Sequence, residues 1–132
     1  TYTGGIWETR VLNTVVKNTI SGASLSSNQI TLPAGDYYID ASSVGFGIAK
    51  HKSVIYDVTN GENLIIGTSE MSSSTTSSTS SSRMAQRLTL AEQVDIEIRT
   101  FGELTRSSDG LGTSSASGLI EIYSDIKIWR LS

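Results

Sequence analysis

Apolar and polar residues alternate along several stretches of the chain, and no stretch keeps the 3.6-residue period of an amphipathic helix. The alternation is clearest near the C-terminus, where isoleucines occupy even positions and charged or aromatic residues occupy the odd ones. Successive side chains of a strand point to opposite faces, so these isoleucines are predicted to line one face of a strand. They are Ile120, Ile122, Ile126 and Ile128.

The same period of two predicts strands at Leu88–Leu90 and Val94–Ile98, with Ala91–Gln93 as a tight turn between them. Asn60-Gly61 accepts positive φ at low cost and predicts a hairpin turn, and Pro33–Asp36 predicts another turn. The remaining strands are predicted at Ile6–Val16, Gln29–Leu32, Tyr37–Val44, Lys52–Val58 and Asn63–Thr68. About seven to nine short strands predict one all-β domain over residues 1–132, a sandwich or a barrel.

Two segments do not have a strand pattern. Ser69–Arg83 contains eleven consecutive hydroxyl residues, Ser72–Ser82, which have no apolar side chain to bury. We expect a long exposed loop there, with a polar edge strand as the alternative. Gly102–Gly118 contains four glycines and is predicted to be a second surface loop.

Composition excludes several classes of protein. Ser and Thr make up 38 of the 132 residues, there is no cysteine, and the formal net charge is −3. The missing cysteines exclude disulfides, a thiol nucleophile and thiolate zinc sites. The acidic balance argues against a nucleic-acid partner. No apolar run approaches the ~18 residues of a membrane span. The chain begins at Thr1, so we expect it to be part of a longer protein.

Candidate catalytic groups are sparse. His51 is the only histidine, and its neighbours Lys50 and Lys52 suggest a solvated basic spot before a strand. No Gly-x-Ser-x-Gly motif supplies a nucleophilic serine. Asp95 and Glu97 share a strand face, but a base on the same face makes charge pairing the ordinary explanation. We therefore expect a protein that is not an enzyme and binds no cofactor. A cation held on a symmetry axis by one carboxylate per subunit stays an open alternative.

Tyr123 and Trp129 lie opposite the isoleucines of the last predicted strand. If the isoleucines face the core, these aromatic side chains point outward. Outward aromatic residues on a strand are typical of a second buried surface, so both are predicted to make subunit contacts. The alternative is that a loop of the same chain covers them.

Several runs of residues resemble known jelly rolls. Val11–Asn13 with Ser26–Ile39 are similar to the entry strands of the tumour-necrosis-factor and complement globular-head superfamily, and Leu88–Ile96 is similar to its Leu-x-Leu-x-x-Gly-Asp-x-Val segment. The hydrophobic terminal strand is the third similar stretch. Glu92-Gln93 stands here where that family has Gly-Asp.

A closer resemblance is to the small jelly-roll modules of bacteriophage tail-fibre and other virion proteins. The runs that carry it are Trp7–Val15, Leu32–Ile39, His51–Gly61, Gly67–Glu70 and Ile126–Trp129. The resemblance implies an antiparallel jelly-roll sandwich, a homotrimer, a position on the virion surface and no enzymatic activity. It also implies that the first and last strands pair, which would bring Trp7 and Trp129 onto neighbouring strands.

The resulting expectation is a tail-fibre tip or similar appendage that attaches to a host-surface glycan or outer-membrane component, alongside other virion proteins. Ser, Thr and Gly loops offer adaptable hydrogen-bonding groups to sugar hydroxyls at a small side-chain entropy cost. The alternatives are a structural capsid, decoration or trimerisation module without a ligand, and a fragment of a depolymerase. The candidate ligand residues in the two loops are Ser73, Thr75, Thr76, Ser107 and Asp109.

Overall fold

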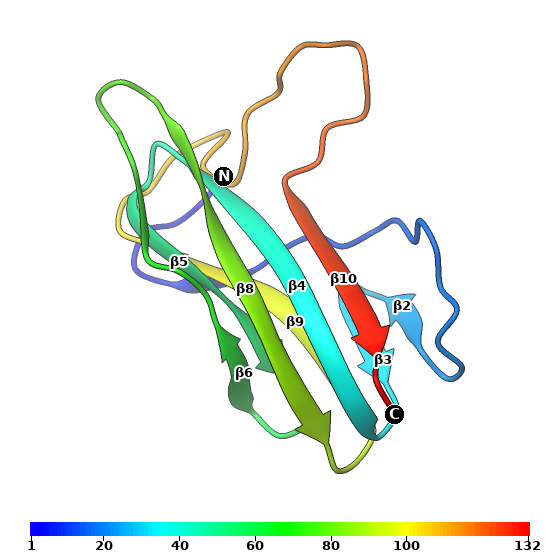
Figure 1. Ribbon diagram of the computed structural model, residues 1–132. Coiled ribbons are helices and arrows are strands. Elements are labelled where there is room, and N and C mark those ends of the chain that lie inside the picture. Colours follow the sequence, from blue (N-terminus) through cyan, green and yellow to red (C-terminus); the bar gives the residue numbers. More distant parts are fainter.

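The computed structural model describes all 132 residues, and the chain forms ten strands and no helix (Figure 1). The prediction of an all-β chain is therefore confirmed. The strands are β1 (Trp7–Thr9), β2 (Ser24–Ser26), β3 (Gln29–Leu32), β4 (Gly35–Phe46), β5 (Ala49–Asp57), β6 (Glu62–Ile66), β7 (Glu70–Ser72), β8 (Thr79–Leu90), β9 (Val94–Gly102) and β10 (Ser124–Arg130). The chain has no helix long and apolar enough to cross a membrane.

The strands form two antiparallel sheets that lie one behind the other (Figure 1). The larger sheet has seven strands with the central order β2-β3-β9-β5-β6, while β1 pairs with β9 and β7 pairs with β5. The smaller sheet has the order β10-β4-β8. The turns predicted at Asn60-Gly61 and Ala91–Gln93 are confirmed as the β5–β6 and β8–β9 connections. Gly61 has a φ of 72°, which a residue with a side chain rarely adopts.

The core between the sheets changes character along the strands. In one half it is apolar, and the hydrophobic effect of burying these side chains stabilises the sandwich. Its fully buried members include Leu32, Tyr37, Ile39, Ile55, Ile65, Met84, Ile96 and Ile98. In the other half the inward positions hold hydroxyls and a histidine. These residues, which we call the hydroxyl layer, are Ser43, His51, Ser53, Ser72, Ser82 and Thr100.

The strand register shows that the change from apolar to hydroxyl side chains occurs at the same height in both sheets. Ala41 pairs with Met84, and two residues further along the same strands Ser43 pairs with Ser82. In the other sheet Ile55 pairs with Ile98, and two residues away Ser53 pairs with Thr100. Ser53 and Thr100 hydroxyls are 2.8 Å apart and satisfy one another. A buried hydroxyl costs little free energy when it is hydrogen-bonded, which lets serine replace apolar residues here.

The strand predicted at Ile6–Val16 is wrong beyond Thr9. β1 pairs with Arg99–Phe101 of β9, while β3 pairs with Val94–Ile96 on the same side of β9. A longer β1 would collide with β3, so the chain leaves the sheet. Val16, beyond this point, is 96% exposed.

The predicted C-terminal strand is confirmed only from Ser124 onward. Ile126 and Ile128 pack against the core, but Ile120 and Ile122 are 78% and 70% exposed. The neighbouring edge of β4 explains this difference. Val44 N donates to Tyr123 O, and Phe46 N then donates to Gly110 O in the preceding loop. That loop occupies the edge that a longer β10 would need.

Pairing of the first and last strands is also wrong. β1 joins β9 in the larger sheet and β10 joins β4 in the smaller one, so Trp7 and Trp129 lie in different sheets. β10 is an edge strand of the smaller sheet.

The hydroxyl tract is not one long loop. Glu70–Ser72 form β7, and residues from Thr79 onward form the first third of β8, leaving only residues 73–78 as a loop. Ser72 and Ser82 are fully buried. The loop prediction for Ser69–Arg83 is thus wrong at both ends, and the alternative of a polar edge strand applies to Thr79–Ser82. By contrast, the predicted loop at Gly102–Gly118 is confirmed to contain no strand after Gly102, where β9 ends.

Candidate functional site

Both candidate ligand loops lie at the same end of the sandwich, next to the hydroxyl layer (Figure 1). We call this the loop end, and define it by residues 73–78, residues 103–112 and the β4–β5 turn. The turn connects the two loops: Gly47 N donates to Ser78 O at 3.1 Å, and Phe46 N donates to Gly110 O at 2.9 Å. The structure therefore brings together residues that are about thirty positions apart in the sequence.

The 73–78 loop has a defined shape despite its uniform composition. Thr76 N donates to Ser73 Oγ at 3.1 Å, and Ser73 N donates to Ser78 Oγ at 2.7 Å. Ser73 Oγ and Thr75 Oγ1 are 3.2 Å apart. Thr75 and Thr76 are exposed, while Ser73 is half-buried. The loop consequently presents its threonines to solvent and uses Ser73 to hold its own backbone.

The second loop is held by an ion pair. Arg106 Nε donates to Asp109 Oδ1 at 2.6 Å, and this hydrogen bond lowers the pKa of Asp109. The Arg106 guanidinium also lies 4.5 Å from the ring centre of Phe46, a cation–π distance. Ser107 O accepts from Thr1 Oγ1 at 2.5 Å. Asp109 thus positions its own loop, and its carboxylate is already committed to Arg106.

Sequence reasoning missed a buried arginine beneath these loops. The Arg10 side chain is almost fully buried and donates to Val44 O at 2.7 Å and to Leu111 O at 2.5 Å. None of the ion pairs of the chain includes it. Burial lowers its pKa to about 10. Arg10 directly follows β1 and precedes the apolar Val11-Leu12 pair, and nothing in this stretch of sequence indicates that the arginine side chain points into the protein.

His51 is not the solvated basic spot that the sequence suggested. It is buried inside β5, because inward and outward positions alternate there and Lys50 and Lys52 take the outward ones. Nε2 lies 2.7 Å from Ser80 Oγ, and Nδ1 has no hydrogen-bond partner. Burial lowers the pKa of His51, which favours the neutral ring. No carboxylate hydrogen-bonds the ring, so a catalytic triad is not assembled there.

Trp129 lies on the outer face of the smaller sheet, as its alternation predicted. It stacks against Tyr38 of β4 with ring centres 5.7 Å apart, and it is 49% exposed. Tyr123 does not share this surface, because its half-buried ring packs on its own chain at Gly112. Gly112 leaves no room for a side chain there: an added Cβ would lie 2.2 Å from the Tyr123 ring.

Two ion pairs lie on that outer face. Arg83 binds Asp40 through two hydrogen bonds of 2.9 and 3.3 Å, and Lys127 contacts Asp125 at 2.7 Å. Lys127 and Asp125 lie on the same strand. The face thus combines an exposed aromatic pair with charges that are largely neutralised locally.

Of the two acids of β9, Glu97 is charge-paired as expected, while Asp95 is in no ion pair and accepts a hydrogen bond from Thr31 Oγ1 at 2.6 Å. Arg99 Nε donates to Glu97 Oε2 at 2.9 Å, and Gln29 donates to Oε1 at 3.2 Å. Burial raises the pKa of Glu97, but hydrogen bonds from Thr9, Arg99 and Gln29 outweigh it and the net pKa is lowered. An ionised carboxylate that already accepts several hydrogen bonds is suited to holding strands together and not to transferring a proton.

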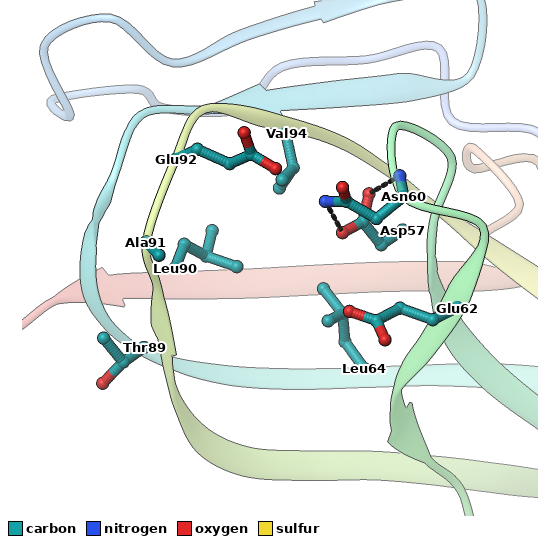
Figure 2. Close-up of a pocket in the computed structure, with 9 residues that line it drawn as sticks. All are labelled: Asp57, Asn60, Glu62, Leu64, Thr89, Leu90, Ala91, Glu92 and Val94. Atoms are coloured by element: carbon teal, nitrogen blue, oxygen red, sulfur yellow. Dashed lines mark hydrogen bonds between the residues drawn. The ribbon is translucent and has the colours of Figure 1, made fainter.

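Figure 2 shows a pocket of about 300 Å³ at the opposite end of the sandwich, between the β5–β6 and β8–β9 turns. Leu64, Leu90 and Val94 line it, with Glu62 and Glu92 at its rim. Both carboxylate oxygens of Asp57 accept hydrogen bonds from Asn60, one from its backbone N at 3.0 Å and one from its side-chain Nδ2 at 2.8 Å. No cluster of three or more potential metal ligands occurs in the chain.

No protein family, curated protein or solved structure matches this chain.

Proposed function

We propose that the chain is a jelly-roll module of a phage tail fibre or related virion appendage, and that it works as a homotrimer that attaches to a glycan or outer-membrane component of the host. The loop end is the attachment surface in this proposal, with Thr75 and Thr76 as its exposed hydroxyls. No chemical step is assigned to it. The resemblance of the sequence runs to such modules is the starting point.

The path of the chain supports the jelly roll. The chain passes between the sheets at the β3–β4, β4–β5, β7–β8, β8–β9 and β9–β10 connections. Repeated crossing between two facing antiparallel sheets is typical of Greek-key sandwiches, of which the jelly roll is one. The short β1, which pairs in the other sheet, departs from the simplest form of that fold.

The observation that supports self-association is the set of large apolar side chains that one copy leaves uncovered, while the number three comes from the resemblance. Trp129 and Tyr38 are exposed on the outer face of its sheet, and β10 itself is a sheet edge. The irregular segments 11–16 and 119–122 expose further large apolar side chains: Val11, Val15, Val16, Leu119, Ile120 and Ile122. Exposed apolar patches of this kind are typical of surfaces that partner subunits cover. An unpaired strand edge adds backbone groups that a partner can satisfy.

Light scattering tests assembly. The wild-type chain should have three times the mass of the 14.1 kDa monomer. Trp129→Ala should lower the mass at a given concentration, because it removes the largest exposed apolar side chain of β10. Thr89→Ala, a change at another exposed position of the smaller sheet, should leave it unchanged. A monomeric wild-type chain would contradict the trimer.

Adsorption tests attachment. Fluorescently labelled trimer should bind at least one strain in a panel of capsulated and non-capsulated bacteria, and the double variant Thr75→Ala/Thr76→Ala should bind less. A stable trimer that adsorbs to no strain would contradict attachment and favour a structural module without a ligand.

A further inference from the structure

A groove of about 510 Å³ lies on the outer face of the larger sheet, on the half nearer the loop end. We call it the aromatic groove and define it by Trp7, Lys50, Lys52, Met71 and Phe101, with Ser69 and Glu70 at its rim. Its volume falls within the roughly 300–1,000 Å³ of small-molecule sites. Neither candidate ligand loop contributes to it.

Strand register explains why these side chains meet. Phe101 of β9 lies directly opposite Trp7 of β1 on one side and Lys52 of β5 on the other. Directly paired residues of neighbouring strands point to the same face, so an indole, a phenyl ring and an ammonium group form one row. Met71 of β7 extends this surface, because it pairs with Lys50.

The two rings offer an open aromatic surface. Their centres lie 5.5 Å apart with the planes tilted by 48°, and Trp7 is 45% exposed. Met71 is exposed beside them. An apolar platform in an otherwise hydroxyl-rich surface suits a ligand that has one apolar face and polar edges. A pyranose ring has this shape, because its axial C–H groups form a face and its hydroxyls point outward.

The charge of the groove is opposite to that of the whole chain. The chain carries a net charge of −3, yet two lysines line this groove. Lys50 makes one long, exposed contact, 4.0 Å between its Nζ and Glu103 Oε1. Lys52 takes part in no ion pair. The one acid of the lining, Glu70, forms no ion pair with Lys50 or Lys52. Lys52, next to Phe101, is therefore free to bind an anionic group of a stacked ligand.

We infer that the aromatic groove binds an acidic saccharide, with one pyranose ring stacked on Trp7 and in contact with the tilted Phe101 ring, and with its carboxylate paired with Lys52. This inference rests on the proposed attachment function and specifies its ligand: a surface glycan that contains a uronic or sialic acid. It adds a second contact, on the sheet beside the loop end, to the contact that the loops make. A neutral sugar would keep the stacking but lose the ion pair.

Titration with three defined probes tests the inference: trigalacturonate, a hyaluronan tetrasaccharide and 3′-sialyllactose, each compared with lactose. At least one acidic probe should bind more tightly than lactose. Lys52→Gln should weaken it roughly two- to fivefold, the range expected of an exposed ion pair. Raising NaCl from about 0.05 M to about 0.5 M should produce a similar loss, since salt screens such pairs. Lys17→Gln, which removes an exposed lysine outside the groove, is the matched control and should bind like wild type.

Trp7→Ala should abolish measurable binding, and Trp7→Phe should restore part of it. Because Trp7→Ala removes the ring contact between β1 and Phe101 of β9, the melting temperature of this variant is measured alongside, and Lys52→Gln gives the independent readout if Trp7→Ala unfolds. Failure of all three acidic probes to bind, or equal affinity for lactose, would overturn the inference.

Adsorption to bacteria separates this inference from the proposed function. If the wild-type chain adsorbs and Lys52→Gln and Trp7→Phe adsorb equally well, attachment stands and the groove is not its site. If the wild-type chain adsorbs to no strain but binds an acidic probe through Lys52, the groove stands and attachment to those cells does not.

Discussion

Replacing Ser82 by alanine should destabilise the protein far more than its place in a run of serines suggests. Ser82 Oγ accepts a hydrogen bond from Ser53 N at 2.9 Å and donates one to Thr68 O at 2.7 Å. Both contacts fall between the end of β6 and the start of β7, where no strand pairs with that edge of β5. The serine hydroxyl therefore replaces a missing ladder partner.

The size of the destabilisation follows from the two backbone groups that lose their hydrogen-bond partner. Alanine would leave the buried Ser53 N–H without an acceptor and Thr68 O without this donor, and an unsatisfied buried group costs about 1–3 kcal/mol. We expect a loss of about 2 kcal/mol in the free energy of unfolding. With an unfolding entropy of about 2.1 cal/mol/K per residue, this lowers the melting temperature by roughly 7 °C.

Ser81→Ala is the matched control, because Ser81 is the exposed neighbour of Ser82 on the same strand. It should change the free energy of unfolding by no more than about 0.5 kcal/mol. Circular dichroism at one fixed protein concentration measures both variants, since assembly makes melting temperatures depend on concentration. Equal melting temperatures for the two variants would refute the ordered strand at Thr79–Ser82.

Two further predictions concern the hydroxyl layer. The pKa of buried His51 is lowered, so the fold favours the neutral ring: the free energy of unfolding should be highest above pH about 6.5 and fall as the pH drops below it. Urea titrations at several pH values should show a smaller fall for His51→Gln, and an unchanged pH profile would contradict the assignment. Gly45→Ala would place a Cβ 2.9 Å from the His51 ring and should cost roughly 1–3 kcal/mol. The same change in a His51→Ala background should cost less, and an equal cost in both backgrounds would mean that the two sites do not touch.

The parts of the fold that were predictable from sequence depended on local signals. Alternation over Val94–Ile98 and the Asn60-Gly61 turn each specify a strand or hairpin without reference to distant residues. The limits of β1 and β10 did not follow from such signals. Val15 and Ile122 have the β-branched character of strand residues, but β3 and the 103–112 loop already occupy the edges they would need.

The loop prediction for the hydroxyl tract was wrong for a different reason. The expectation of a loop assumed that inward positions must be apolar. Ser82 is buried because Ser53 of β5 and Thr68 of the β6–β7 connection supply its hydrogen-bond partners, which no pattern within the tract reveals. His51 was misassigned in the same way, since the flanking lysines describe only the outward face of β5.

Of the candidate site residues, the exposed Trp129 and the threonines of the 73–78 loop lie where their patterns placed them. Arg10 and the pairing of Trp7 with Phe101 depend on contacts between residues about ninety positions apart. Such contacts leave no local trace in the sequence.

The hydroxyl layer also bears on how β8 finds its place beside β4. Sliding β8 by two residues would keep every side chain on its original face, and within Ser72–Ser82 it would exchange one hydroxyl for another. The tract itself therefore selects among registers only weakly. The first inward side chain that can distinguish them is Met84, which pairs with Ala41 and fills the apolar core. The register of β8 is thus specified by its C-terminal half, through Met84 and the apolar side chains that follow it, and the serines take the alignment which that half sets.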